Sequence, residues 1–219
     1  MADGDVPARA ALDAAWPGWA DDVDRVVAAD GGAAAATSLG LRLDLVVGDM
    51  DSIGPNDLAQ VRVRGIALDV RPVDKDESDT EIALRAALEG GATAVTVLGA
   101  TGGARIDHAL ANVWLLALPA ASGRAVVLLD ARSRLRLLDG PGRAELSGFA
   151  GDLVSLLPFD GLATGVTTEG LAYPLRDEDL PVGPSRGLSN VRTGHVANVS
   201  LRAGRLLIIE THQSEGDSK

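Results

Sequence analysis

Acidic side chains and glycines follow three of the short apolar runs in the first half of the sequence. Residues 30–32 are Asp-Gly-Gly, residues 48–52 are Gly-Asp-Met-Asp-Ser, and residues 99–103 are Gly-Ala-Thr-Gly-Gly. If the runs are strands of an open parallel sheet, these segments lie where such sheets bind ligands, outside the carboxyl ends of the strands. Glycines let a ligand approach the backbone, and a helix N-terminus offers N–H groups to a phosphate. The pattern favours a phosphate-binding edge.

A fourth acidic segment, residues 74–79, contains four carboxylates and one lysine. If Asp49, Asp51 and Asp79 converge, Mg²⁺ would neutralise their repulsion while bridging phosphate oxygens. Lys75 and Arg105 could hold phosphate oxygens and stabilise charge that develops in a transition state. Taken singly, each motif also has a structural explanation, because Asp-Gly-Gly is a common turn and acidic residues suit a helix start.

Alternating strand and helix patterns connect these segments and predict a mostly parallel sheet covered on both faces. Apolar, β-branched runs predict strands, and Ser78 is a candidate helix cap. Pro119 is expected to end the last and longest helix. The expected strands are residues 23–29, 43–47, 66–70, 94–98 and 125–129, and the expected helices are residues 32–39, 55–63, 79–89 and 106–118.

The pattern changes near residue 130, where short alternating runs separated by turn residues replace the helices. This change predicts a second, all-β domain, a small sandwich, with the domains at residues 1–131 and 132–219. Ala203-Gly204 between the last two runs is typical of a hairpin. The expected strands are residues 134–138, 153–157, 162–167, 196–201 and 205–209.

Composition narrows the possible functions. The 219 residues include 31 acidic and 20 basic ones, and the formal net charge of −11 argues against nucleic-acid binding. The absence of cysteine excludes disulfides and thiolate metal sites, so a metal would be a hard cation with oxygen ligands. No apolar run is long enough to span a membrane, and the acidic start is unlike a signal peptide. We therefore expect a cytoplasmic protein.

The ordered motifs resemble those of the thiamine pyrophosphokinase family, which makes thiamine diphosphate from thiamine and ATP. They run in the family's order through both halves of the chain. The matching stretches are ADGGA (29–33), GDMDSI (48–53), VDKDESDTEIAL (73–84), GATGGARIDHALANV (99–113), VSLLP (154–158), GVTTEGLAYPL (165–175) and GLSN (187–190).

The resemblance implies a Rossmann-like catalytic domain, a C-terminal β-sandwich that binds thiamine and dimerises, and a homodimer with active sites at the interface. ATP would be the co-substrate, and Mg²⁺ would bind carboxylates that match Asp49, Asp51 and Asp79. The implied catalytic residues are these three with Asp76 and Arg105. The implied nucleotide-binding residues are Asp30, Gly31, Gly32, Ser52, Lys75, Gly102, Gly103, Asp107 and His108, and those for thiamine are Tyr173, Ser189 and Asn190.

Three departures from the family pattern stand out. Ser78 replaces a threonine but keeps the hydroxyl, and the Gly-Gly-Ala-Arg loop is one residue longer than the usual Gly-Gly-Arg. Residues 2–5 look like the turn that follows the family's first strand, with no strand before it. Either the sheet lacks a strand, or the natural chain begins upstream of Met1.

Other functions remain open from the sequence. A related pyrophosphokinase could act on a pterin alcohol. A phosphatase of the haloacid-dehalogenase type could use Asp49 as its nucleophile beside Asp51. A non-catalytic nucleotide-binding module could keep the fold, although every candidate metal carboxylate is present here. The identity of any general base, the preferred metal and nucleotide, and regulation are not readable from the sequence.

Overall fold

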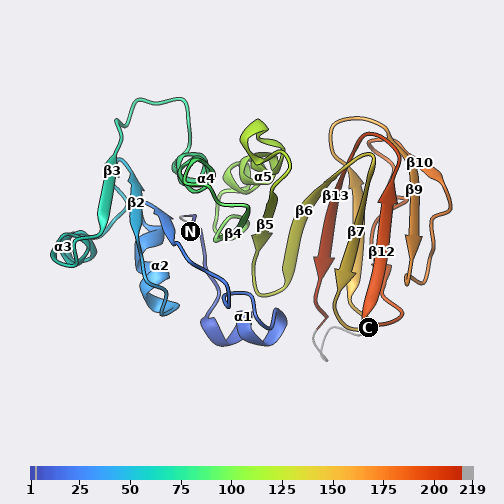
Figure 1. Ribbon diagram of the computed structural model, residues 1–219, viewed down its shortest axis with the longest axis horizontal. Helices are drawn as coiled ribbons and strands as arrows, with labels where there is room; N and C mark the ends of the chain where they lie inside the picture. Colours follow the sequence, from blue (N-terminus) through green and yellow to red (C-terminus); the bar gives the residue numbers. More distant parts are fainter. Residues whose placement is uncertain (3, 214–219) are drawn as a thin grey trace. The chain divides into compact units, whose positions relative to one another are not determined.

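The computed structural model describes residues 1–2 and 4–213. They form two compact units, which meet between Ala131 and Arg132 in the sequence. Within the described residues, no helix is long and apolar enough to cross a membrane. The first unit combines parallel strands with helices, and the second consists of antiparallel sheets (Figure 1).

The first unit contains five helices, two short 3₁₀ turns and five strands among the described residues. They are α1 (Arg9–Ala15), α2 (Gly32–Ser38), α3 (Pro55–Val63), α4 (Asp79–Glu89), α5 (Ile106–Trp114), η1 (Leu115–Ala117), η2 (Pro119–Ala121), β1 (Val27–Ala29), β2 (Leu45–Gly48), β3 (Ala67–Val70), β4 (Ala94–Leu98) and β5 (Ala125–Leu129). Strands β4 and β5 and helices α3 and α4 have the bounds that the sequence predicts.

Helices cover both faces of the parallel sheet β1–β2–β3, as the sequence predicts. On one face, Ala28 and Val46 pack with apolar residues of α2 and α3. On the other face, Val27 and Val47 pack with Ile82 and its neighbours on α4. Because successive strand residues point to opposite faces, both faces of β1 and β2 are apolar.

Helix α4 begins at Asp79 because Ser78 caps it. The Ser78 hydroxyl accepts a hydrogen bond from the Glu81 backbone N–H at 3.2 Å, and a glutamate at this position completes the capping-box sequence. The cap fixes the residue that opens the helix, and that residue is a carboxylate.

The predicted helix at residues 106–118 is wrong in length. Helix α5 ends at Trp114 and is followed by η1 and η2, so α4 is longer than α5. The residue before a proline avoids the helical region, and Leu118 before Pro119 has an extended ψ of 131°. Helix α1, at residues the sequence left unassigned, packs Leu12 against Leu98 and Leu129.

Strand β1 is shorter than predicted, because only residues 27–29 pair with β2. Strands β1 and β4 do not pair with each other. Between them lie the first residues of the chain: the Met1 ammonium donates to the Val27 carbonyl at 2.7 Å, and the Ala2 N–H donates to the Leu98 carbonyl at 2.8 Å. The expected turn at residues 2–5 includes Asp3, which lies outside the described residues.

The second unit consists of two antiparallel sheets that share one apolar core. The core draws on both sheets, with Val166 and Val199 from one and Leu156 and Ile208 from the other. Counting only strands of this unit, the orders are β10–β9–β12–β7 and β11–β8–β13–β6. The strands are β6 (Ser133–Asp139), β7 (Gly142–Ser147), β8 (Leu153–Pro158), β9 (Ala163–Glu169), β10 (Glu178–Leu180), β11 (Asn190–Val191), β12 (Val196–Leu201) and β13 (Arg205–Thr211).

The hairpin predicted at Ala203-Gly204 is wrong. Strand β12 pairs with β7 and β9, whereas β13 pairs with β6 and β8, so the connection passes from one sheet to the other. Ala203 forms an isolated bridge with Thr164, and a Cβ on Gly204 would lie 2.4 Å from the Leu162 carbonyl oxygen. The small residues allow this close crossing. Strands β7, β10 and β11 were not predicted.

We predict that protein stability rises between pH 6 and pH 8 through the Met1 amine. Burial lowers the pKa of this amine from 8.0 to about 6, so the unfolded chain binds more protons in this range and stability is lost as the pH falls. The effect is about 2 kcal/mol. Urea unfolding of the free and N-terminally acetylated protein at both pH values measures it. An equal change in both proteins would contradict the assignment.

Candidate active site

Three carboxylates from separate segments come together in the first unit. Asp30 follows β1, Asp49 follows β2, and Asp79 opens α4, and each offers an oxygen within 4.8 Å of the others. In the described part of the chain this is the one such group of potential metal ligands. From the sequence we expected carboxylates to meet at the strand ends. That expectation had Asp51 as the third metal ligand and Asp30 as a nucleotide-binding residue.

Asp30 is held rigidly at the end of β1. Its backbone has a positive φ of 35°, and only 1% of the residue is exposed. Its Oδ2 accepts a hydrogen bond from the Ser52 N–H at 3.1 Å, whereas its Oδ1 is buried and has no hydrogen-bond partner within the described residues. Burial raises the pKa of Asp30. The hydrogen bond from the Ser52 N–H lowers this pKa, and the nearby aspartates raise it, so that the net shift is upward. An orphaned buried oxygen among carboxylates is suited to a cation.

Gly48 leaves the space in which these carboxylates meet. Its φ is 137°, and a Cβ there would lie 3.1 Å from both the Asp30 Cβ and the Asp79 Oδ1. Any other residue would therefore be strained and would push the carboxylates apart. The glycine before Asp49 is a requirement of the site.

Lys75 partly balances the negative charge. Its Nζ lies 3.4 Å from Asp49 Oδ2 and 3.1 Å from Asp79 Oδ1. Desolvation lowers the pKa of Lys75, but its bonds to both aspartates outweigh this and the net shift is upward. The Asp51 backbone N–H and then Lys75 lower the pKa of Asp49. One ammonium against three carboxylates leaves an excess of negative charge if all three are ionised.

Asp51 and Asp76 lie outside the carboxylate group. The Met50 φ of 67° turns the chain between the two aspartates of the motif, and the Asp51 carboxylate accepts a hydrogen bond from the Ser52 hydroxyl at 2.9 Å. Asp76 is exposed in the loop before α4. The predicted roles of both residues remain predictions.

The loop of residues 99–103 and the start of α5 carry the predicted phosphate-binding residues. Arg105 precedes α5 and forms an exposed ion pair with Asp107, which lowers the pKa of Asp107 to about 2. His108 is exposed on the same helix. Asn112, whose role was not predicted, is buried and donates to the Ala100 carbonyl at 2.8 Å. Asn112 belongs to the stretch GATGGARIDHALANV (99–113), and this is the sequence feature that could have pointed to it.

The predicted phosphate-binding glycines lie against the N-terminal residues. A Cβ on Gly32 would be 2.8 Å from the Ala2 carbonyl oxygen, and one on Gly102 would be 2.7 Å from the Asp5 carbonyl oxygen. Gly31 precedes α2, and Gly103 has a φ of 99°. Close backbone packing thus explains Gly32 and Gly102 without a ligand.

In the second unit, Asn190 fixes the backbone of Tyr173. Asn190 is buried, accepts from the Tyr173 N–H at 3.0 Å and donates to the Tyr173 carbonyl at 2.6 Å. The Tyr173 residue is 64% exposed. Ser189 has a φ of 55° and donates its N–H to the Ser155 hydroxyl at 3.0 Å. The arrangement presents an aromatic ring to solvent from a fixed loop.

Two family models match the chain. "Thiamin pyrophosphokinase, catalytic domain" covers residues 18–128, and "Thiamin pyrophosphokinase, vitamin B1 binding domain" covers residues 143–206. A curated thiamine pyrophosphokinase of Bacillus subtilis is 26% identical over 195 residues, which are 89% of this chain and 90% of that protein.

Solved structures have the same fold. The thiamine pyrophosphokinase of Bacillus subtilis superposes with a TM-score of 0.82 at 23% identity and covers 97% of this chain and 98% of its own. A thiamin pyrophosphokinase family protein of Enterococcus faecalis gives 0.80 at 28% identity, with 97% of each chain covered.

We predict that Mg²⁺ stabilises the protein through Asp30, Asp49 and Asp79. Mg²⁺ far above its dissociation constant should raise Tm by about 5 °C, because it binds only the folded carboxylate group. Asp30→Asn should lose most of this shift, and Asp51→Asn should keep it. Thermal unfolding with and without MgCl₂ measures the effect. If Asp51→Asn lost the Mg²⁺-dependent rise in Tm and Asp30→Asn kept it, the result would favour Asp49, Asp51 and Asp79 as the ligands.

Proposed function

The chain belongs to the thiamin pyrophosphokinase family, and we propose that it transfers a pyrophosphoryl group from ATP to thiamine at the carboxylate group of the first unit. Family membership supports the reaction and ATP as co-substrate. The observation that carries the location is the convergence of Asp30, Asp49 and Asp79, with an unpaired buried oxygen among them.

We infer that Mg²⁺ binds Asp30, Asp49 and Asp79. Three carboxylates are the ligand type that hard cations prefer, and the space beside Gly48 keeps their oxygens close together. When bound, Mg²⁺ would supply positive charge to the phosphate oxygens of ATP. Asp51 and Asp76 lie on the loops beside this group, and we propose that they act near the metal or the nucleotide.

The reaction needs positioning and charge stabilisation more than covalent chemistry. The thiamine hydroxyl oxygen bonds to the β-phosphorus, the bond from that phosphorus to the α-phosphate oxygen breaks, AMP leaves with the electron pair, and the hydroxyl proton is released. Lys75 beside Asp49 and Asp79 is placed to hold a phosphate oxygen. Arg105 before α5 can exchange its exposed partner Asp107 for phosphate.

Further residues are proposed to complete the nucleotide site. Ser52 donates its N–H to Asp30 and thereby joins the motif loop to the end of β1. The N-terminal turns of α2 and α5 provide N–H groups that suit phosphate. The proposed nucleotide-binding residues remain Asp30, Gly31, Gly32, Ser52, Lys75, Gly102, Gly103, Asp107 and His108.

Thiamine is proposed to contact the exposed ring of Tyr173, because a cationic heteroaromatic ring is attracted to an aromatic face. The Asn190 side-chain amide makes hydrogen bonds to the Tyr173 backbone, and we propose Asn190 as a positioning residue. Ser189 holds the adjoining turn. The unit of residues 132–219 would thus be the thiamine-binding domain.

The finer description of the fold and assembly is also a proposal. The first unit is Rossmann-like, the second is a β-sandwich, and the protein is a cytoplasmic homodimer with active sites at the interface. Ile106, Leu110 and Trp114 support the dimer, because they recur every four residues on α5 and all three are exposed. The matched family does not favour a pterin alcohol substrate, a phosphatase or a non-catalytic module.

The direct test is AMP release from ATP and Mg²⁺ with and without thiamine. We expect AMP that depends on thiamine and equals the thiamine diphosphate formed. Asp79→Asn should lower kcat at least about 100-fold, because a ligand carboxylate is lost. Glu89→Gln, at the exposed far end of α4, should leave kcat unchanged. Near-normal turnover of Asp79→Asn would show that the metal assignment is wrong.

A second test concerns Tyr173. Tyr173→Ala should raise the KM for thiamine about tenfold, because the free energy of one cation–π contact is lost, and it should leave the KM for ATP unchanged. Tyr173→Phe keeps the ring and should retain the KM. Because the side chain is exposed, Tm should not change in either variant. If Tyr173→Ala keeps its thiamine KM, the ring does not bind the substrate.

A further inference from the structure

A charged residue for which the sequence predicted no role lies in the core of the second unit. Arg192 follows β11 and is 2% exposed, and Glu210 of β13 is also 2% exposed. The Arg192 Nη2 donates to the Glu210 Oε1 at 2.6 Å, and the Arg192 Nη1 donates to the Leu146 carbonyl at 2.6 Å. Because β13 and the Leu146 strand β7 belong to different sheets, Arg192 ties the chain after β11 to both sheets.

The space for the Arg192 side chain depends on Gly148, which follows β7. A Cβ on Gly148 would lie 2.9 Å from the Arg192 Nε and 3.2 Å from the Arg192 Cζ. Burial lowers the pKa of Arg192, and the charge of Glu210 opposes this shift without cancelling it. Removing an ion from water is unfavourable, so the bonds to Glu210 and Leu146 must hold the guanidinium in the core.

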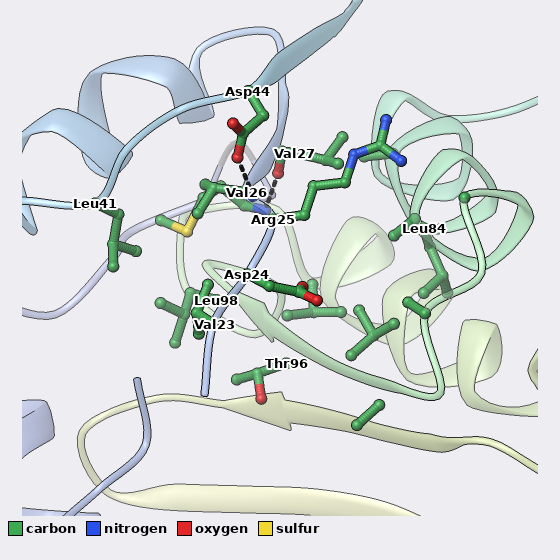
Figure 2. Close-up of a pocket in the computed structure, with 18 of the residues that line it drawn as sticks. Val23, Asp24, Arg25, Val26, Val27, Leu41, Asp44, Leu84, Thr96 and Leu98 are labelled. Carbon is green, nitrogen blue, oxygen red and sulfur yellow. Dashed lines mark hydrogen bonds between the residues drawn. The ribbon is translucent and has the colours of Figure 1, made fainter. Parts of the chain in front are cut away.

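The first unit contains a comparable interaction. Beside a cavity of about 880 Å³, the Asp44 carboxylate accepts a hydrogen bond from the Val26 N–H at 2.9 Å, which Figure 2 shows just before β1. The other Asp44 oxygen pairs with Arg42 at 2.7 Å. In both units, a charged side chain thus bonds to one residue of opposite charge and to the backbone of another segment.

The loop that carries Tyr173 lies along residues 190–193. Arg192 forms an antiparallel bridge with Leu171. The N–H groups of residues 172 and 193 donate to carbonyls of the opposite segment, at 2.9 and 3.0 Å. The Asn190 amide adds its two bonds to the Tyr173 backbone. An interaction that fixes residues 190–193 therefore also fixes the backbone that presents the Tyr173 ring.

Residues 190–193 have little regular strand pairing of their own. Strand β11 contains two residues, which pair with the start of β8, whereas strands usually have at least three. The Arg192 N–H donates to the Asp152 carbonyl at 2.9 Å, and the Arg192 carbonyl accepts from the Gly151 N–H at 3.0 Å. These bonds run to β8 and to the turn before it. The guanidinium adds the contacts to β13 and β7, inside the core.

We propose that Arg192 is a positioning residue for thiamine, and that it acts by holding residues 190–193 and with them the loop of Tyr173. This inference rests on the proposed binding of thiamine at Tyr173. Arg192 is buried and does not contact the substrate. It sets the fraction of molecules in which the Tyr173 ring stands where thiamine can meet it, and a smaller fraction lowers the apparent affinity in proportion.

Arg136 of β6 provides a matched control. It also contacts Glu210, at 3.4 Å, and donates to a β7 carbonyl, that of Glu145, at 2.8 Å. Strands β8 and β13 separate β6 from β11, so this arginine makes the same kinds of contact away from the Tyr173 loop. Arg134 contacts Glu210 as well, at 2.8 Å. Glu210 therefore keeps two guanidinium partners when either Arg192 or Arg136 is replaced, and we expect both variants to fold.

The first experiment measures the kinetics of Arg192→Met and Arg136→Met, which replace the guanidinium by an adaptable apolar side chain. Arg192→Met should raise the KM for thiamine about threefold or more, because the loop is in place in fewer molecules. The KM for ATP should not change, since ATP is proposed to bind the first unit. Arg136→Met should keep both constants. An equal rise of the thiamine KM in both variants would overturn the proposal, because it would come from a general loosening of the core.

Two further variants disturb the same contact in other ways. Arg192→Lys keeps the charge, but one ammonium cannot reproduce the forked bonds to Glu210 and Leu146, so the thiamine KM should lie between those of the wild type and Arg192→Met. Gly148→Ala should displace the guanidinium and also raise the thiamine KM. If Arg192→Met does not fold, these variants decide the question, and a wild-type thiamine KM in both would refute the role of Arg192.

Fluorine NMR tests the positioning without turnover. Tyr173 is the only tyrosine of the sequence, so labelling with fluorotyrosine gives a signal from this residue alone. Arg192→Met should broaden or split this signal, because the loop exchanges between positions. Arg136→Met should keep the wild-type signal. An unchanged signal in folded Arg192→Met would show that the guanidinium does not hold the loop.

Thiamine added without ATP separates this inference from the proposed substrate site. In the wild type, thiamine should shift the fluorine signal of Tyr173. If it does not, the thiamine contact at Tyr173 is wrong, and the assignment of Arg192 to thiamine is wrong with it, even where Arg192→Met disturbs the loop. If thiamine shifts the signal and binds Arg192→Met as tightly as the wild type, only the role of Arg192 is wrong.

Discussion

Asp30, Asp49 and Asp79 repel one another, and the first unit must hold their carboxylates together against this repulsion. Their oxygens lie within 4.8 Å of one another, and Lys75 is the cation that contacts two of them. Burial is the larger cause of the raised pKa of Asp30, and the nearby negative charges raise this pKa further. A protein that keeps such a group must hold it by other interactions. The ends of β1 and β2, the cap of α4 and the missing side chain of Gly48 provide them.

The N-terminal residues contact the strand end that precedes the first carboxylate, and they also contact two of the glycines proposed to bind phosphate. The Ala29 N–H bonds to Met1, and Asp30 follows directly, so the position of Met1 bears on the first carboxylate. Ala2 lies against Gly32, and Asp5 lies against Gly102. Glycines that would suit a phosphate are therefore also needed for chain packing.

The sequence predicts best what local patterns decide. Helix α4 has its predicted bounds because Ser78 caps it and its apolar residues recur with helical spacing. The prediction of a hairpin at residues 203–204 is wrong because a turn of small residues can connect strands of two sheets as well as neighbouring strands of one sheet. The expectation that Asp51 binds the metal came from its spacing to Asp49 and from the family resemblance, and it remains a prediction. Met50, between Asp49 and Asp51, has a positive φ, and no pattern of residue types reveals that angle.

Buried asparagines hold the backbone near two of the exposed side chains that are proposed to meet substrate. In the second unit Asn190 uses its amide oxygen and nitrogen on the Tyr173 backbone, so replacing it would release the loop before it removed any ligand contact. Asn112 holds the loop at Ala100 by donating an amide N–H to the Ala100 carbonyl. Arg105 and Tyr173 are exposed and can meet a substrate without breaking the interactions that hold their loops. At these two positions the side chain proposed to meet substrate is a different residue from the asparagine that holds the loop, so the loop can keep its shape when substrate enters.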